Sequence, residues 1–392
     1  MRRYPTAAYN QLFPNGACVA DFLPFDPAED GDHYRPEPHF FEWWYFDVAF
    51  DDGTYLVAIF HSSLYNAVDH KPTLDLRYYP PEGAPIVAIG RFDRAGRFDQ
   101  GDYRAAPDHC RVQIGECLAV DEGDHYRLNL RHGSLAAELT FFPELPGWRA
   151  GTGHLFADAA TGQHFDWIVP VPRARVTGKL TVAGESRRVS GIGYHDHNWG
   201  NMYLSSAFRR WTWGRVQAGD WTLLFGDVIG RVDAHGVTPH VTPFMLALNG
   251  EILLTTSHIH IEEDDFTRES HIGVDYFRRL RLTTQKKNGK ISLVHLTLTA
   301  RRAIEALSFA APYPVLGRHP RLRGAAELAF YLAQGKPLVG RGAAKTLGKG
   351  SYLRWEADYQ IECTLHSGTG NRESVARTAT SGQTLYEMMF FS

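Results

Sequence analysis

Two apolar runs joined by a short turn decide the fold: FFEWWYFDVAF at residues 40–50 and TYLVAIFH at residues 54–61, with DDG at residues 51–53 between them. Aromatic and β-branched residues favour strands, and an Asp-Gly pair tolerates the positive φ of a tight turn. The stretch therefore predicts a β-hairpin. Because both runs are apolar on both faces, we expect the hairpin to be covered on both sides.

The rest of the sequence continues as short strands separated by Gly, Pro or Asp turns. We expect strands at residues 86–92, 110–115, 125–131, 136–142 and 165–171, two more within 179–193, a second set that starts at Trp211, and strands at 221–228, 244–248, 252–261, 290–300 and 352–365. Only residues 322–334 carry the apolar stripe of a helix, with Gly335 as its stop. Evenly spaced strands favour barrels or sandwiches over alternating strand–helix units.

This pattern predicts a mainly all-β protein with two antiparallel β-barrel domains packed together and one helix in the C-terminal half. Residues 1–34 are rich in Pro, Asp and Gly and predict an N-terminal arm. Residues 35–205 are expected to form the first barrel domain and residues 206–392 the second. No flexible linker separates the two halves, so we expect them to pack tightly.

The composition limits the class of function. Aromatic residues make up 13% of the 392 residues, which suits strands and apolar pockets. A net charge of −3 gives no electrostatic case for nucleic acid or an anionic membrane. Four widely spaced cysteines form neither a disulfide framework nor a paired zinc motif, so we expect a reduced, cytoplasmic protein.

No apolar run approaches the ~20 residues of a membrane helix. A lipid-like substrate would then be met by a soluble protein, and a transient contact with a membrane surface is left open.

The first motif with chemical interest is HFFEWWYFD at residues 39–47. Strand alternation puts Trp43, Tyr45 and Asp47 on one face and Glu42, Trp44 and Phe46 on the other. A carboxylate buried among rings costs free energy unless it is paired or protonated. Glu42 therefore either holds the core together through hydrogen bonds or contacts a ligand, and both interpretations stay open.

The second motif is GIGYHDHNWG at residues 191–200. In an extended chain Tyr194, Asp196 and Asn198 share one face, while His195, His197 and Trp199 share the other. A phenol and an amide beside a carboxyl group can hold it in one protonation state through hydrogen bonds. The alternative is a polar plug that closes a barrel end, with every group satisfied internally.

A zinc site is a further alternative for this motif. Its ligands would be His195 and His197 together with His258, His260 and Glu262, because histidine pairs two residues apart occur in β-built metal sites. However, 19 histidines make chance pairs common, and no HExxH motif is present. We expect no metal and no other cofactor.

Several catalytic motifs are missing from the sequence. There is no GxSxG elbow and no phosphate-binding P-loop, and no GxGxxG follows a strand and opens a helix. Serine-nucleophile, nucleotide and flavin-type dinucleotide chemistry therefore have no support.

The two motifs resemble the signatures of the AttH/hydroxyneurosporene synthase family, in the same order and with a similar separation. The resemblance implies two lipocalin-like β-barrels and covers most of the chain. That family includes carotenoid 1,2-hydratases and is related to plant hydratases and to fungal decalin-forming pericyclases. By this resemblance, Tyr194 and Asp196 form the acid-bearing pair, and His164 and Trp167 are the nearest candidates for an upstream His and Trp.

The working hypothesis is protonation of an alkene in a hydrophobic isoprenoid or polyene, which leads to hydration or cyclisation. Asp196 would donate the proton, Tyr194 and Asn198 would position it, and aromatic rings would stabilise the cation. The candidate binding residues are Glu42, Trp43, Trp44, Tyr45, His61, His164, Trp167, His195, His197, Asn198, Trp199, Trp211 and Trp213. A pericyclase and a non-catalytic isoprenoid- or lipid-binding protein are the alternatives, and the oligomeric state is left open.

Overall fold

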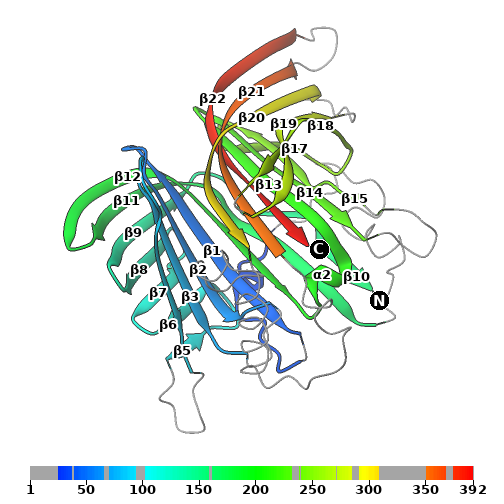
Figure 1. Ribbon diagram of the computed structural model, residues 1–392. Helices are drawn as coiled ribbons and strands as arrows, with labels where there is room; N and C mark the ends of the chain where they lie inside the picture. The colour runs from blue at the N-terminus through cyan, green and yellow to red at the C-terminus, as the bar shows by residue number, and fades with distance from the viewer. Residues whose placement is uncertain are drawn as a thin grey trace.

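The structure is a computed structural model that describes residues 25–37, 39–65, 70–93, 102–158, 161–231, 238, 240–270, 272–284, 291–308, 350–367 and 374–391. Its strands form two large antiparallel sheets that curl as half-barrels and pack against each other (Figure 1). The expected all-β class with two lipocalin-like units is thus confirmed. The helix predicted at residues 322–334 lies outside the described residues.

The first sheet contains twelve strands. They are β1 (Phe41–Phe50), β2 (Tyr55–Ser63), β3 (Thr73–Tyr79), β4 (Ile86–Arg91), β5 (Tyr103–Ala105), β6 (Arg111–Ile114), β7 (Cys117–Asp121), β8 (Tyr126–His132), β9 (Leu135–Pro143), β10 (Trp148–Asp158), β11 (Gln163–Val182) and β12 (Glu185–Gly200). Their hydrogen-bonded order is β4-β3-β2-β1-β12-β11-β9-β8-β7-β6-β5, and β10 pairs with β11. Strands β1 and β12 are far apart in the sequence but pair as antiparallel neighbours, so the two sequence motifs lie side by side.

The second sheet contains ten strands. They are β13 (Phe208–Ala218), β14 (Trp221–Gly230), β15 (His240–Val241), β16 (Phe244–Leu248), β17 (Glu251–Thr256), β18 (Ile259–Glu269), β19 (Val274–Thr284), β20 (Ile291–Ser308), β21 (Gly350–Ser367) and β22 (Ser374–Phe391). Their order is β17-β16-β14-β13-β22-β21-β20-β19-β18, and β15 pairs with β14.

Two short helical turns complete the described structure. The 3₁₀ turn η2 (Pro27–Asp30) precedes β1, and helix α2 (Leu204–Ala207) joins the two sheets. The domain division predicted at 205/206 falls within this connection and stays a prediction. No helix among the described residues is long and apolar enough to cross a membrane.

The predicted hairpin is present as β1 and β2. Gly53 adopts a φ of +82° in the turn, and the carboxylate of Asp52 accepts a hydrogen bond from the Thr54 amide at 3.0 Å. Only a residue without a Cβ takes that φ without strain, so the Asp-Gly turn fixes the register of the hairpin.

Two strand predictions differ from the structure. Residues 252–261 do not form one strand, because β17 ends at Thr256 and β18 begins at Ile259, and these strands lie at opposite ends of the sheet order. The strand expected at 165–171 is instead part of the 20-residue β11. Register shifts near Val171 accommodate prolines 170 and 172, which cannot donate to a regular ladder.

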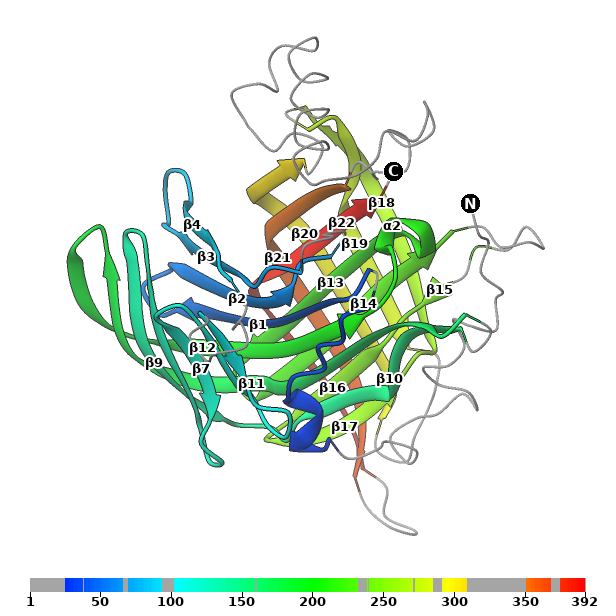
Figure 2. The same cartoon turned by 90° about the horizontal axis from the view of Figure 1, so that it is seen from below.

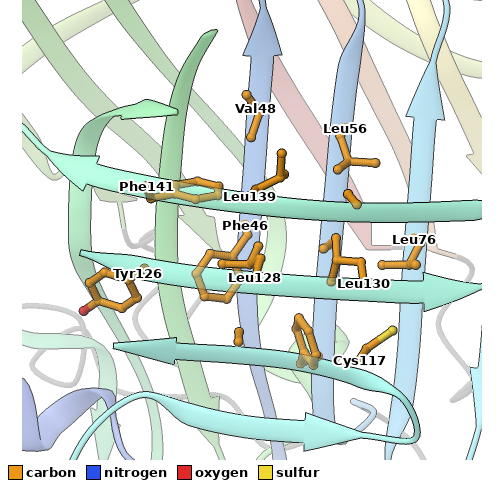
Figure 3. Packing of buried hydrophobic residues seen from close by; sticks show 14 of the residues in the cluster. Phe46, Val48, Leu56, Leu76, Cys117, Tyr126, Leu128, Leu130, Leu139 and Phe141 are labelled. Carbon is orange, nitrogen blue, oxygen red and sulfur yellow. The ribbon is translucent and has the colours of Figure 1, made fainter. Parts of the chain in front are cut away.

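Buried apolar side chains gather in three clusters. One lies inside the curl of the first sheet, where Phe46 and Val48 face Leu128 and Phe141 across the half-barrel (Figure 3). A second lies inside the second sheet. The third, which we call the intersheet layer, lies between the two sheets and includes Tyr45, Trp148, Trp167, Tyr194, Phe208 and Met389. Figure 2 shows β1 and β12 passing across the second sheet at this contact. Strand alternation on β1 and β12 therefore sends one set of side chains into the first-sheet core and the other into the intersheet layer.

Candidate active site between the two sheets

Asp196 lies in the intersheet layer with three hydrogen-bond donors around its carboxyl group. The Tyr194 hydroxyl donates to Oδ2 at 2.9 Å, and the indole Nε1 of Trp167 donates to the same oxygen at 3.2 Å. The Asn198 amide donates to Oδ1 at 2.9 Å. Asp196 itself is 7% exposed. Tyr194, Asp196 and Asn198 share one face of β12 because alternate strand residues point to the same side.

Burial controls the protonation of this carboxyl group. It raises the pKa of Asp196 from 3.8 to about 7, against the lowering effect of the hydrogen bonds from Tyr194 and Trp167. Burial also raises the pKa of the Tyr194 phenol well above its ordinary value, so Tyr194 remains a hydrogen-bond donor. At neutral pH a substantial fraction of Asp196 therefore carries a proton.

Aromatic rings from both sheets surround the acid. The ring centroid of Trp213, on β13, lies 5.0 Å from that of Tyr194, and the ring of Tyr45 lies 6.3 Å from Tyr194. Trp148 packs edge-on against Trp167 at 5.4 Å. The neighbouring Trp211 lies 4.8 Å from Phe391 in the same layer. The candidate residues Trp211 and Trp213 thus come from the second sheet, and Trp213 contacts the ring of Tyr194, the residue that donates to the acid.

A buried ion pair crosses between the sheets beside these rings. Both terminal guanidinium nitrogens of Arg215 donate to the carboxylate of Asp47, and the guanidinium carbon lies 4.9 Å from the ring centroid of Tyr194. The Tyr45 hydroxyl donates to Asp47 Oδ2 at 2.8 Å. Arg215 was not among the predicted residues, although it follows Trp211 and Trp213 on the same strand face.

A second ion pair lies further along the layer and also escaped prediction. Arg354, on β21, pairs with Glu387 on β22 and donates to the Tyr45 hydroxyl at 2.8 Å. Its Nε donates to the Tyr352 hydroxyl at 2.9 Å. Glu387 contributes to the raised pKa of Asp196, which places this negative charge within electrostatic reach of the acid.

His61 and a third ionic group, centred on Arg77, lie close to each other at the boundary between the two sheets. His61 lies opposite Trp43, with ring centroids 6.2 Å apart, and burial lowers the pKa of His61 to about 4. The imidazole is therefore neutral at pH 7. Nearby, Arg77 bridges Asp75 and Glu305 across the two sheets.

The remaining histidines of the second motif lie on the reverse face of β12. His195 contacts the carboxylate of Asp30 through Nε2 at 3.0 Å and the Tyr45 carbonyl through Nδ1 at 2.9 Å. His197 Nε2 lies 3.2 Å from Glu42 Oε1. All three side chains of Glu42, His195 and His197 are buried. The strand therefore separates them from Asp196.

Ionic contacts set the charge of this reverse-face group. Burial would raise the pKa of Glu42, but hydrogen bonds from His197, His33 and Ser62 bring it down to about 2. Burial would lower the pKa of His197, but Asp30 and Glu42 raise it to about 9. The aromatic members Trp44 and Trp199 accompany this group, since Trp44 stacks on His197 at 4.3 Å.

His164 does not reach Asp196. It pairs with Asp166, which also binds His154, on the side of β11 that faces away from Trp167. Of the upstream pair that the resemblance implied, Trp167 contacts the acid and His164 does not.

The alternative zinc ligand set, His195 and His197 with His258, His260 and Glu262, is wrong. His195 and His197 are fully buried on the first sheet, whereas the His260 and Glu262 side chains on β18 are 54% and 52% exposed and pair with each other. Within the described ranges, neither group of potential metal ligands contains His258, His260 or Glu262. The i, i+2 spacing on two strands could not indicate that the strands belong to different sheets.

Comparison with known proteins agrees with this architecture. A family model described as AttH-like matches residues 27–319. The chain is also similar to a protein named hydroxyneurosporene dehydrogenase from Chlorobaculum tepidum, with 25% identity over 283 residues that cover 62% of this chain and 70% of that protein.

Two solved structures show the same fold. One, from Nitrosomonas europaea, is described as an AttH, with a TM-score of 0.59, 16% identity, and coverage of 93% of this chain and 97% of that one. The other is kievitone hydratase from Nectria haematococca, with a TM-score of 0.50, 13% identity, and coverage of 99% and 97%. At these identities the likeness extends to the fold alone.

Proposed function

The chain belongs to the AttH-like family, and from that premise we propose that it is an enzyme that protonates an alkene of a hydrophobic isoprenoid or polyene. Asp196 donates the proton, and the resulting cation is hydrated or captured by a second alkene. The observation that carries the proposal is a buried carboxyl group whose pKa is raised to about 7 beside a phenol donor.

The surroundings of Asp196 suit both halves of a proton transfer. Before transfer, burial favours the protonated acid. After transfer, Tyr194, Trp167 and Asn198 can all donate to the carboxylate that is left behind. Donors that are already in place stabilise the developing charge without reorganisation, which lowers the barrier.

Rings of the intersheet layer would stabilise the cation. Trp43, Tyr45, Trp211 and Trp213 line the same layer, and each aromatic face contributes ~0.5–2 kcal/mol to a nearby cation. Access of water then decides the product, because an ordered water gives an alcohol and a second alkene gives a ring. We assign the reverse-face residues Glu42, Trp44, His195, His197 and Trp199 no contact with the reacting alkene.

The names of the relatives are consistent with this substrate class. One relative is named hydroxyneurosporene dehydrogenase. We carry over only the class of substrate in that name and not the dehydrogenase activity.

The test is incubation of the purified full-length chain with linear terpenoids and polyenes in ¹⁸O-labelled water, followed by mass spectrometry. We expect either a product that contains the label or an isomeric cyclic product, and loss of both with Asp196→Asn. A matched control is Asp166→Asn, because Asp166 is also a buried carboxylate but faces away from the intersheet layer. This control should retain turnover.

Other outcomes separate the alternatives. An Asp196→Asn variant that remains active, together with loss of activity in Trp213→Ala, would refute the acid mechanism and favour a pericyclase. Extraction of unaltered ligand from a chain that turns over nothing would favour a binding protein.

A further inference from the structure

A second group of chemically reactive side chains lies on the reverse face of β1 and β12, away from Asp196. His33, Glu42 and His197 each offer a ligand atom, and these atoms all lie within 4.8 Å of one another. Glu42 Oε1 is 3.2 Å from His197 Nε2 and 3.5 Å from His33 Nδ1. Two ligands bound to zinc at 2.0–2.2 Å in a tetrahedral arrangement are separated by about 3.4 Å. The separations of Glu42 Oε1 from the two histidine nitrogens therefore match those of zinc ligands.

We propose that His33, Glu42 and His197 bind a divalent transition-metal ion, with zinc as the ion that this donor set suits best. Two histidines and one carboxylate form a common three-ligand set for zinc and leave a coordination position for water. The site uses none of the residues assigned to proton transfer and does not depend on that proposed function.

The groups behind the ligands are arranged as metal sites require. His197 Nδ1 lies 3.2 Å from Asp30 Oδ1, so a carboxylate stands behind a ligating histidine. Glu42 accepts a hydrogen bond from the His33 backbone amide at 2.7 Å and another from the Ser62 hydroxyl. These contacts fix the orientation of the carboxylate and favour its charged form.

Aromatic stacking fixes the two imidazole rings. The ring of His33 stacks on Trp199 with centroids 3.8 Å apart and an angle of 3°. The ring of His197 stacks on Trp44 at 4.3 Å. Each ring is thus held in a fixed orientation before a metal arrives, with the two ring planes 57° apart, and this lowers the entropy lost on binding.

Unpaired atoms distinguish a metal site from a plain ionic bridge. A protonated His197 between Asp30 and Glu42 would account for the charge balance of that histidine. His33 Nδ1 is then left with only a long contact of 3.5 Å to Glu42 Oε1 and no well-aligned hydrogen bond, and the 3.2 Å contact between His197 Nδ1 and Asp30 Oδ1 is also poorly aligned. An unsatisfied buried polar atom costs about 1–3 kcal/mol, and a bound cation would use the free lone pair of His33.

The proposed ion would join the segment around η2 to the two central strands of the first sheet. His33 comes from that segment, Glu42 from β1 and His197 from β12. The His33 side chain is 28% exposed, which gives an ion a route from solvent.

The test uses tag-free full-length protein stripped with a chelator and then titrated with Zn²⁺, with stoichiometry read by elemental analysis and native mass spectrometry. We expect one ion per chain and a higher unfolding temperature with Zn²⁺. His33→Phe keeps a ring against Trp199 but lacks the ligand nitrogen, and Glu42→Gln removes the charge. Each should weaken binding at least about 100-fold, because even partners behind a ligand contribute 10–100-fold.

His258→Ala serves as the matched control, since His258 is an exposed histidine in the connection between β17 and β18, away from the first sheet. This variant should bind Zn²⁺ as the parent chain does. X-ray absorption of the loaded parent protein should show two imidazole nitrogens and a carboxylate oxygen, a readout that needs no variant. The proposal is overturned if the parent chain binds no stoichiometric ion, if the bound ion has no histidine ligands, or if folded His33→Phe and Glu42→Gln bind as tightly as the parent.

Discussion

The raised pKa of Asp196 makes the stability of the folded protein depend on pH in a way that one substitution removes. In the unfolded chain this carboxyl group ionises near its ordinary pKa of 3.8, whereas in the folded protein it ionises near 7. Below pH 3.8 both states are protonated and no free-energy difference arises. As pH rises from 3.8 to 7, the unfolded state loses its proton first and the folded protein becomes relatively less stable.

The size of the effect follows from the two pKa values. A rise from 3.8 to about 7 corresponds to about 4 kcal/mol in the free energy of unfolding, at roughly 1.4 kcal/mol per pH unit. The amide introduced by Asp196→Asn cannot ionise, so the variant does not lose this free energy as pH rises. Between pH 5 and pH 7, the free energy of unfolding of the variant should therefore rise by about 2 kcal/mol relative to that of the parent chain, whatever the difference between them at pH 5.

Urea denaturation of both proteins at half-unit pH steps from 5 to 8 measures this difference. The comparison isolates Asp196, because every other titrating group is present in both chains. A difference that stays flat over this range would falsify the claim that burial keeps the acid protonated. A lowered pKa of Asp196 would also give a flat difference, because the carboxyl group would then be ionised in both states above pH 5, and that result would remove the basis for its role as a proton donor.

The remaining predictions concern neighbouring groups. Tyr194→Phe removes a donor from Asp196 and should move the alkaline decline of activity upward by roughly one pH unit, measured as kcat/KM against pH. Asp47→Asn leaves Arg215 buried without its carboxylate and should cost about 3–5 kcal/mol in urea denaturation, and an additional Arg215→Met should recover part of that loss. Phe46→Ala should cost about 3–5 kcal/mol by the same assay, because its ring is 1% exposed and stacks on a buried histidine; a cost below 1 kcal/mol would mean that this part of the core collapses into the gap.

Local sequence patterns predicted much of the fold. The Asp52-Gly53 turn and its flanking apolar runs were enough for the first hairpin, because a tight turn fixes strand pairing over short distances. Alternation also sorted Tyr194 and Asp196 onto a face opposite His195. Strand boundaries near prolines 170 and 172 could not be predicted, because register shifts in the ladder let β11 continue past residues that normally end a strand.

The partners of the candidate site depend on tertiary contacts that no local pattern contains. Arg215 meets Asp47 across 168 positions of sequence, and Arg354 meets Tyr45 across 309. The local sequence still gave a clue to both arginines, because Arg215 lies two residues after Trp213 and Arg354 two residues after Tyr352, on the same strand face. His33 gave no such signal, because it comes from a segment without regular secondary structure, and only the folded chain brings it to Glu42.

Successive residues of strand β12 point alternately into two chemically different environments, the intersheet layer and the interior of the first half-barrel. Deletion or insertion of a single residue between Gly193 and Gly200 would reverse the side to which the following side chains point. The imidazoles would then enter the intersheet layer, and the acid would enter the interior of the first half-barrel. Natural variation in length among related chains should therefore collect in turns such as Ala183-Gly184, whereas this eight-residue stretch should keep a constant number of residues even where the identities of its side chains change.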